Sequence, residues 1–526
     1  MKRRTFLAAS AAAATVRLAR PALAAGTSKL VFVPQGNLIS MDPVWTTAAV
    51  TRAAGLMVYE TLYGRDQTLR PHPQMVAGHV VEDGGKRWTM TLRDGLMWHD
   101  GTPVLARDCV ASIKRWLARD PVGATLKPRL DALEAKDDKT IVWRLNKPFA
   151  SLPNALAKTQ PSPVMMPERI ANTDPFKQIT EVVGSGPFRW VKDEYVSGNQ
   201  AVFVKNEKYV PRSEAADYAA GGYRVMLDRV EWKIIPDAAT AANALSAGEV
   251  DWVEMPLPDL LPMLRKAAGV SVGQLDPFGI YPGLRPNFLN APTSEKAIRQ
   301  VMLKAIDQKE VMTALMGDDT EAYRAPVGLF IPGSECANDA GMEAITKRHT
   351  TEELKAMLTA AGYKGERVAL MHPTDQVFYD PMTQVVAAQL KKIGMNIDDQ
   401  ATDWGTIVQR RNSKEPLDKG GWSLFVTGFP AVDQGNPILA INLRGNGDKG
   451  WVGWPTDPKL ESLRDAWIDS TDEAEKKKLS EQIQTEAFDF VSVIPLGQYM
   501  QSTAWRSDLK GLLKGPVPVF WNISRS

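Results

Sequence analysis

The sequence predicts an α/β protein, and three observations support this prediction. Short runs rich in β-branched and aromatic residues alternate along the chain with longer runs that have the apolar spacing of amphipathic helices. Several of the helical runs stop at a glycine, as helix C-termini commonly do. The chain has 526 residues, of which 44% are hydrophobic and 24% are charged. It can therefore bury a large core in about two to four domains.

The first 24 residues are interpreted as an export signal and not as part of the fold. A basic start, the apolar run 6–16 and the small residues before Ala25 give the three regions of a secretory signal. The pair Arg3-Arg4 near the start is typical of the twin-arginine type. The sequence therefore predicts a protein that is exported to the periplasm and carries a signal peptide over residues 1–24.

Strands and helices alternate in order through the first half of the chain. The predicted strands are 29–33, 87–92, 140–145, 184–191, 200–205 and 229–235. The predicted helices are 47–59, 106–119 behind the start signal Thr102-Pro103, and 238–247 before Gly248. This alternation indicates sheets that are flanked by helices.

The second half has longer helices. The run 294–316 places Ile298, Val301 and Ile306 on one face, and Gly317 follows it, so it is predicted as one helix. The other predicted helices are 351–361, 377–393, 456–468 and 471–490, and the predicted strands are 368–371, 395–401 and 422–425. A weak domain boundary is expected at 281–290.

Charge and cysteine content argue against two classes of function. The whole chain has a formal net charge of +2, and its first 24 residues hold five basic side chains and no acidic one, so the exported part has a net charge of −3. Nucleic acid is not an expected partner, because it requires a basic face. Cys109 and Cys336 could form a disulfide after export, but their spacing does not decide this, and a buried thiol is the common role in a helical run such as that around Cys109. A structural zinc site is not expected, since no Cys-x-x-Cys occurs.

The sequence contains no familiar catalytic motif. His-Glu-x-x-His, Gly-x-Ser-x-Gly and Gly-x-x-x-x-Gly-Lys-Ser/Thr are all absent. The five histidines are not spaced as local ligands: His72, His79, His99, His349 and His372. We therefore expect no enzymatic activity, no cofactor and no metal site, although a triad assembled from distant residues stays open because triads are defined in space.

Tryptophan is the richer signal, with fifteen in the chain. Five of them lie in polar or Gly/Pro-rich segments: Trp45, Trp404, Trp422, Trp451 and Trp454. Tryptophan on a loop often forms the wall of a ligand site, and for each one core filling is an equally good alternative. Asp433 follows a predicted strand in the same region, and a carboxylate in an aromatic cleft could anchor a cation.

Several stretches resemble, in order, the family 5 extracellular solute-binding proteins of ABC transporters, which include dipeptide, oligopeptide and nickel binders. The main one is WTMTLRDGLMWHDGTPVLARDCVASIKRW at 88–116, whose two Asp-Gly pairs are turn chemistry and are not expected to contact a ligand. The further matches are SMDP at 40–43, GSGPFRW at 184–190, KNEKYV at 205–210, AATAANALSAGEVDW at 238–252, EKAIRQVMLKAIDQKEVM at 295–312, LKAMLTAAGY at 354–363 and AAQLKKIGMNI at 387–397.

The resemblance implies a two-lobe periplasmic binding protein fold of the large type II group, with a hinge and an extra subdomain in the first lobe. On that model residues 25–283 form lobe 1, including a subdomain at about 56–180, and residues 284–490 form lobe 2. Residues 491–526 return to lobe 1. The implied function is the capture of a peptide or an amine-bearing solute by a monomer, which then delivers it to the membrane subunits of an ABC permease. Ligand would stabilise the closed state through its higher affinity for that state.

The resemblance also carries a candidate ligand set. In dipeptide-binding members an Asp just before a Gly-Asp-Pro loop holds the ligand's amino group, and Asp433 matches it, with Asn436 in place of the second Asp. Those members hold the carboxylate with an Arg, but the matching loop 372–381 has none and has Asp375 instead. This departure predicts an amine-bearing or cationic ligand without a free carboxylate, or a longer peptide. The other candidate contacts are Trp404, Trp422, Phe429, Met41 and Tyr281.

Two other functions remain as alternatives at this stage. An exported hydrolase or oxidoreductase would suit a twin-arginine signal, which often carries folded enzymes, but the sequence has no cofactor fingerprint. A chaperone-like protein that holds unfolded peptide without closing is the other alternative.

Overall fold

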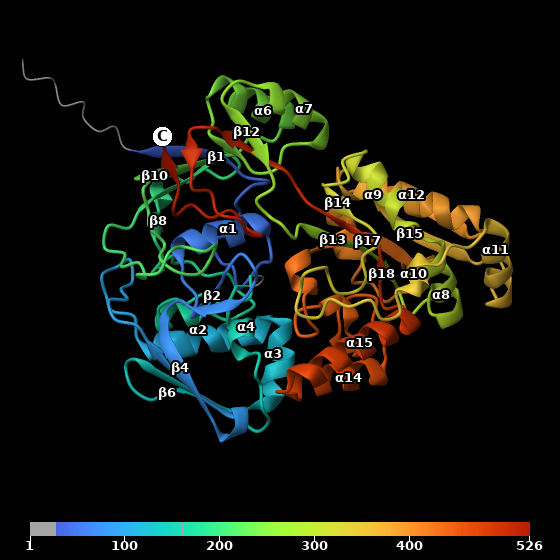
Figure 1. The fold of residues 1–526 in the computed structure, drawn as a ribbon, viewed down its shortest axis with the longest axis horizontal. Helices are drawn as coiled ribbons and strands as arrows, with labels where there is room; N and C mark the ends of the chain where they lie inside the picture. The colour runs from blue at the N-terminus through green and yellow to red at the C-terminus, as the bar shows by residue number, and fades with distance from the viewer. Residues whose placement is uncertain (1–27, 160–161) are drawn as a thin grey trace, which may run out of the picture.

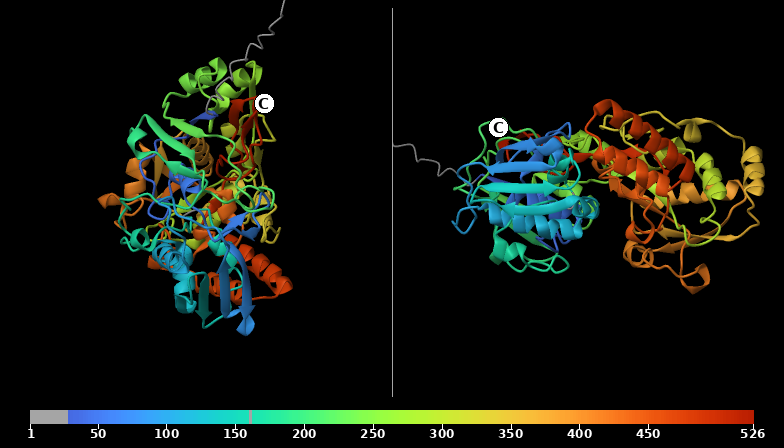
Figure 2. Two further views of the ribbon diagram at one scale, coloured as in Figure 1. Left: turned by 90° about the vertical axis from the view of Figure 1, so that its left-hand side faces the viewer. Right: turned by 90° about the horizontal axis from the view of Figure 1, so that it is seen from below.

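The computed structural model describes residues 28–159 and 162–526, so the predicted export signal lies outside the described residues. The chain forms two lobes that lie side by side (Figures 1 and 2). Each lobe is built on a seven-stranded mixed sheet, and a separate four-stranded sheet belongs to the first lobe. The predicted α/β class with two lobes and an extra subdomain is confirmed.

Lobe 1 is built on the sheet with strand order β12-β20-β11-β1-β10-β9-β8. Its strands are β1 (Lys29–Val33), β8 (Phe188–Trp190), β9 (Gln200–Lys205), β10 (Arg229–Lys233), β11 (Trp252–Val253), β12 (Val270–Gly273) and β20 (Thr503–Arg506). Strand β1 pairs in parallel with both β10 and β11, so the carboxyl ends of these three strands lie at the same edge. The helices α1 (Ala49–Val58), α6 (Ala238–Ala247) and α7 (Leu261–Lys266) pack beside this sheet.

The subdomain of lobe 1 is an antiparallel sheet with order β4-β5-β7-β6. Its strands are β4 (Val76–Glu82), β5 (Arg87–Leu92), β6 (Leu130–Ala135) and β7 (Thr140–Leu145), and α2 (Ala106–Arg119) packs on β6 and β7. Trp88 and Trp98 are buried, and the Asp100 carboxylate accepts the backbone N–H of Thr102 at 3.0 Å. The segment that carries the family signature therefore forms turns and core.

Lobe 2 is built on the sheet with order β14-β19-β13-β17-β15-β16, and β18 pairs with β13. Its strands are β13 (Ile280–Pro286), β14 (Tyr323–Arg324), β15 (Arg367–Pro373), β16 (Asn396–Thr402), β17 (Leu424–Pro430), β18 (Ile494–Pro495) and β19 (Gln498–Tyr499). Its longer helices are α8 (Lys296–Ala305), α9 (Gln308–Met316), α11 (Thr351–Ala360), α12 (Tyr379–Lys392), α14 (Pro458–Asp469) and α15 (Glu473–Phe490).

The remaining elements are short. They are α3 (Pro121–Leu126), α4 (Leu152–Leu156), α5 (Glu168–Ala171), α10 (Glu343–Thr346) and α13 (Trp404–Arg410), with the two-stranded pairs β2 (Tyr63–Arg65) and β3 (Pro71–Pro73), and β21 (Leu509–Lys510) and β22 (Ser524–Arg525). The 3₁₀ turns used below are η2 (Lys127–Arg129) and η6 (Ala431–Gln434).

The chain passes between the two sheets twice. Strand β12 belongs to the first sheet and β13 to the second, so residues 274–279 make the first crossing. Strand β19 belongs to the second sheet and β20 to the first, so residues 500–502 make the second crossing. Strand β13 pairs with β17 along its whole length, from Ile280 opposite Pro430 to Pro286 opposite Leu424. The boundary expected at 283 lies four residues after the first crossing, and the boundary expected at 491 lies nine residues before the second. In the first crossing Gly279 has φ +63, and a Cβ there would lie 2.1 Å from the Tyr499 carbonyl oxygen, so only glycine fits.

Two sequence expectations differ from the structure. The helix predicted over 294–316 is two helices, because the backbone is extended at Ile306 and the Asp307 carboxylate caps α9 by accepting the N–H of Lys309 at 2.9 Å. Cys109 and Cys336 are both buried free thiols, so they do not form the disulfide that export would permit.

Candidate functional site

A cavity of about 300 Å³ lies between the lobes, and we call it the first interlobe cavity. Lobe 1 contributes segments around β1, α1 and β11, lobe 2 contributes segments around β15 and β17, and both crossings contribute as well. Its polar and aromatic lining includes Gln35, Arg52, Trp252, Glu254, Asp276, Gln376, Phe378, Tyr379, Tyr499 and Gln501. The cavity is therefore assembled only where the two lobes meet.

Lobe 1 presents the carboxyl ends of two parallel strands to this cavity. Gln35 follows β1, Glu254 follows β11, and the pairing of Val33 with Val253 brings them together. The backbone N–H and the side-chain amide of Gln35 each donate to the Glu254 carboxylate at 2.7 Å. Ligands of open α/β sheets bind outside the carboxyl ends of strands, and this wall has that arrangement.

Lobe 2 forms the opposite wall in the same way, because β15 and β17 are parallel. Phe378 and Tyr379 follow β15, and the Phe378 ring stacks on Tyr499 with 5.4 Å between centroids. Gly428 lies on β17, where a Cβ would be 2.7 Å from Ile280 Cγ2 and 3.0 Å from the Tyr379 hydroxyl oxygen. The close approach of Tyr379 to the strand therefore requires a glycine.

Charges of both signs line the first interlobe cavity. Burial raises the pKa of the Glu254 carboxyl, which the bonds from Gln35 and the charge of Arg52 oppose. Burial also raises the pKa of the Asp276 carboxyl, against the Gly279 and Phe278 backbone N–H groups and Arg52. The lining thus holds one cation and two carboxylates, which gives it a formal charge of −1 when all three are ionised. Such a cavity suits a solute that has a positive group to meet the carboxylates and a negative group to meet the arginine.

Asp433 lies in η6 of lobe 2, and three cations of lobe 1 act electrostatically on its carboxylate. The residue is 8% exposed, and its Oδ1 atom is buried without a hydrogen-bond partner. Burial raises the pKa of this carboxyl; Lys158, Arg65 and Arg52, all of lobe 1, oppose the rise, and Asp120 adds to it. The sequence-predicted anchor is therefore a buried interlobe carboxylate with unused bonding capacity.

None of the seven predicted contacts, Asp433 included, is among the residues that line the first interlobe cavity. Asp375 is exposed, and its Oδ1 accepts the backbone N–H of Trp404 at 2.8 Å, so it holds the start of α13. Trp404 packs against Tyr379, with 5.1 Å between ring centroids, and thus supports a residue of the cavity wall.

The remaining four candidates are buried in the core. Trp422 is 0% exposed and packs edge-on against Phe425. Tyr281 and Phe429 are buried in one cluster of lobe 2, where the Tyr281 hydroxyl is buried without a partner, and Met41 is buried in the lobe 1 core. Direct contact of these residues with ligand stays a prediction.

The sequence interpretation missed Gln35, Arg52, Glu254 and Asp276, which come from four separate segments. A usable signal existed for two of them, since Gln35 and Glu254 directly follow strands of the lobe 1 sheet. Arg52 lies on the second turn of α1, where a basic residue looks like an ordinary surface position. Only the packing of the lobes identifies it.

Ion pairs join the lobes away from the cavity. The Arg129 guanidinium of η2 donates to Asp469 at 2.9 Å and to Asp465 at 3.1 Å, both on α14 of lobe 2. Lys147 reaches the second oxygen of Asp469 at 3.3 Å. Arg129 is 7% exposed, so this contact, which we call the interlobe latch, is largely shielded on the lobe 1 side.

Residues 28–159 and 162–526 contain no group of three or more His, Cys, Asp or Glu side chains placed to bind a metal ion. Over the same residues, no helix has the length and apolar character needed to span a bilayer.

Comparisons with known proteins agree with this architecture. Residues 70–451 match the family model described as bacterial extracellular solute-binding proteins, family 5 Middle. A Sinorhizobium fredii (strain NBRC 101917 / NGR234) protein named "Probable peptide ABC transporter periplasmic-binding protein y4tO" is 37% identical over 99% of this chain and 98% of its own length. The "Probable D,D-dipeptide-binding periplasmic protein DdpA" of Escherichia coli K12 is 23% identical over 83% of this chain and 81% of its own.

Two solved structures share the fold. AgaA of A. tumefaciens R10, in complex with agropinic acid, has a TM-score of 0.78 at 21% identity, covering 95% of this chain and 99% of its own. DppA of Helicobacter pylori, in complex with the peptide STSA, also has a TM-score of 0.78, at 18% identity, covering 95% of this chain and 98% of its own. At these identities the likeness concerns the fold.

Proposed function

The chain belongs to the bacterial extracellular solute-binding proteins of family 5, and from this membership we propose that it captures a short peptide or a related zwitterionic solute between its lobes and delivers it to the membrane subunits of an ABC transporter. The proposal includes export to the periplasm through the signal at residues 1–24 and action as a monomer. The relatives are binding proteins by name, so the proposed role is transport and not catalysis.

One observation carries the choice of solute class: the first interlobe cavity is lined by Arg52, Glu254 and Asp276, and Arg52 also acts electrostatically on the buried Asp433 carboxylate. Its volume of about 300 Å³ lies at the lower end of the range for small-molecule sites, roughly 300–1,000 Å³. A cavity of this size is too small for a segment of unfolded protein, which counts against a chaperone-like holder.

The missing arginine in the loop 372–381 predicted an amine-bearing or cationic ligand without a free carboxylate, or a longer peptide. Arg52 lines the first interlobe cavity and brings positive charge to it from the opposite lobe, so a free carboxylate is compatible with the site. We therefore widen the proposal to zwitterions, with the ammonium group directed to Asp433 and the carboxylate to Arg52.

The mechanism requires no chemical step. A solute that contacts both walls binds the closed state more tightly than the open state, and it shifts the population by that difference in affinity. The segments 274–279 and 500–502 are the places where the chain can change its backbone angles to open the lobes. Closure then removes water from the charged groups, which strengthens their attraction to the solute.

Native mass spectrometry of the protein purified from periplasm tests the proposal. We expect a fraction of the protein to carry a small organic solute, which denaturation releases, and calorimetry to show binding of short peptides. A bound metal or flavin would favour an exported enzyme. A protein that carries no solute and binds no short peptide would contradict the proposal.

A further inference from the structure

A second cavity lies between the lobes on the other side of the Asp433 turn, and we call it the second interlobe cavity. Its volume is about 500 Å³. Pro430 lines the first interlobe cavity, whereas Val432, Gly435 and Asn436 line the second, so the segment 430–436, which contains η6 and Asp433, contacts both. The two cavities therefore share one wall of lobe 2.

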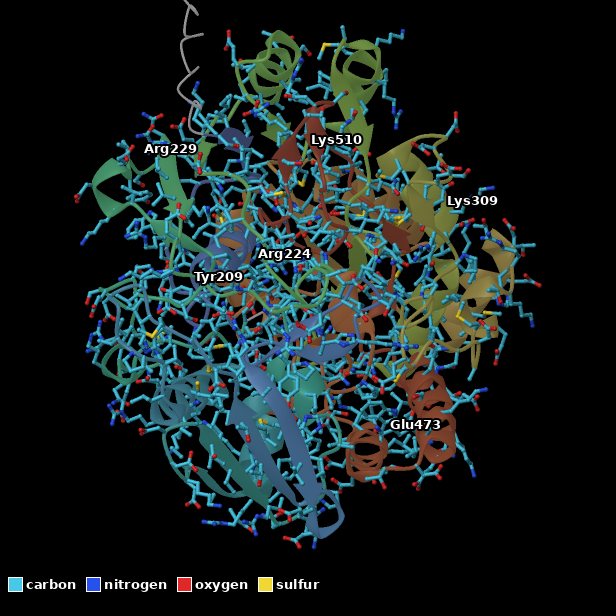
Figure 3. All side chains as sticks on the ribbon, turned by 60° about the vertical axis from the view of Figure 1, so that its left-hand side comes forward. Tyr209, Arg224, Arg229, Lys309, Glu473 and Lys510 are labelled. Carbon is cyan, nitrogen blue, oxygen red and sulfur yellow. The ribbon has the colours of Figure 1, made fainter. Side chains whose placement is uncertain are left out.

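The second interlobe cavity has charges of opposite sign on its two walls. Lobe 1 contributes Arg65 and Arg70, and lobe 2 contributes Glu335 and Glu473. Glu473 begins α15, which Figure 3 shows on the lobe 2 side of the molecule. An occupant with an acidic group would be drawn with that group toward lobe 1, since the carboxylates of lobe 2 repel it.

Arg65 is the group built to receive such an acid. It is 3% exposed, its Nη2 donates to the Asn154 carbonyl oxygen at 3.3 Å, and its Nε is buried without a hydrogen-bond partner. Burial lowers the pKa of its guanidinium, while Asp433 and Glu335 oppose this from across the lobe boundary. An unpaired donor on a buried cation is costly, and an anionic acceptor would remove that cost.

Both walls are held in place before any ligand arrives. The Asp66 carboxylate, next to Arg65, accepts the N–H groups of Thr68 at 2.8 Å and Arg70 at 2.9 Å, which fixes the lobe 1 turn. On lobe 2 the Asn436 side-chain oxygen accepts from Ile438 at 3.1 Å, and its amide donates to Glu335 at 3.3 Å. An aspartate at 436 would repel Glu335, so asparagine is what allows Glu335 to line this wall.

We propose that the second interlobe cavity is an extension of the ligand site that takes a carboxylate-bearing group of the solute, with Arg65 as its anchor. The inference rests on the proposed function, because it assigns a subsite to the same captured solute. It makes this chain selective for peptides or peptide-like solutes that carry an additional acidic group.

Calorimetry with four tripeptides tests the inference: Ala-Ala-Ala, Glu-Ala-Ala, Ala-Glu-Ala and Ala-Ala-Glu. We expect the wild type to bind at least one glutamyl tripeptide about tenfold more tightly than trialanine, since a hydrogen bond to a charged group is worth about 1.5–3 kcal/mol.

The Arg65→Ala variant loses this preference but still binds trialanine, which shows that it is folded. The Arg65→Lys variant keeps part of it, because lysine retains the charge but not the planar fork. Arg107→Ala, an exposed arginine of the subdomain, is the matched control and keeps the full preference.

Four outcomes overturn the inference, and they differ in what they say about the proposed function. If the wild type binds all four tripeptides equally, or if the preference survives Arg65→Ala, the subsite is wrong and the proposed function stands. If Arg65→Ala weakens all four equally, Arg65 only stabilises the closed lobes. If the wild type binds none of the four, the proposed function fails and the inference fails with it.

Discussion

Arg129 of lobe 1 and Asp469 of lobe 2 form an ion pair across the lobe boundary, with 2.9 Å between Nη2 and Oδ1. The Asp469 side chain is 30% exposed and that of Arg129 is 9% exposed, so solvent screens the pair only in part. The pair joins the two lobes in this structure, and neither of its residues lines the first interlobe cavity. We therefore expect it to influence the balance between open and closed states independently of the solute.

We expect Asp469→Ala to shift the ligand-free protein toward the open state. Loss of a partly screened ion pair costs about 1 kcal/mol, which changes the ratio of open to closed molecules about fivefold. Small-angle X-ray scattering should show a larger radius of gyration, and the affinity for solute should fall by a similar factor. Arg144→Ala removes the Arg144–Glu134 pair within the subdomain and is the control, because that pair does not join the lobes. An unchanged radius and affinity in Asp469→Ala would show that the latch has no influence.

Asp433→Asn should separate binding from stability. A charged hydrogen bond is worth about 1.5–3 kcal/mol, so the affinity for peptides with a free ammonium group should fall at least about tenfold. The melting temperature of the ligand-free protein should stay the same or rise, because the variant removes a buried carboxylate whose Oδ1 has no partner. Calorimetry and thermal unfolding measure the two effects. N-acetylated peptide is the control ligand, and equal loss of its affinity would contradict the role of Asp433 as the ammonium anchor.

Gly428→Ala should reduce solute binding by moving the cavity wall. A Cβ at this position would lie 2.7 Å from Ile280 Cγ2 and 3.0 Å from the Tyr379 hydroxyl, so Tyr379 or the strand must move. Overpacking of this kind costs about 1–3 kcal/mol of folding free energy, which chemical denaturation would measure. Gly78→Ala is the matched control, since a Cβ there meets no atom within 4 Å. Normal affinity in Gly428→Ala would mean that Tyr379 need not hold its position.

His99 should make the stability of the protein fall in acid without affecting binding at neutral pH. Burial lowers the pKa of His99 from about 6.5 to about 4, and its Nε2 lies 3.0 Å from the Gly186 carbonyl oxygen. The unfolded chain takes up a proton below about pH 6.5 while the folded protein does not do so until about pH 4, so this part of the stability is lost over that interval. Denaturation measured across this range should show a smaller slope for His99→Gln. A His99→Gln protein that is stable but fails to bind solute would place His99 in the site instead.

Local sequence patterns predicted the bounds of helices and strands well where those bounds did not depend on tertiary contacts. The bounds of β1 and α2 agree with prediction, because each has a full apolar pattern and a clear start. The prediction of one helix over 294–316 was wrong because, in the sequence alone, Asp307 cannot be distinguished from an exposed helical residue. Its capping role appears only when the backbone turns at Ile306.

The candidate site was predictable only where a single segment carries the signal. Asp433 follows a strand in a recognisable loop, and the structure places it at the lobe boundary. Asp375 follows a strand too, but its side chain holds the α13 backbone, which sequence spacing cannot distinguish from a ligand contact. Arg52 and Arg65 acquire their role from the opposite lobe, so no local pattern identifies them.

The two crossings at 274–279 and 500–502 have a mechanical consequence. Both ends of the described chain belong to lobe 1, where the Arg525 guanidinium donates to the Lys29 carbonyl oxygen at 3.1 Å. A force applied between residues 28 and 526 would first break this contact and then peel strands from the lobe 1 sheet. Lobe 2 lies outside the direct load path until the first sheet yields, so a stretched molecule would lose its lobe 1 half of the cavity while the lobe 2 half stayed folded.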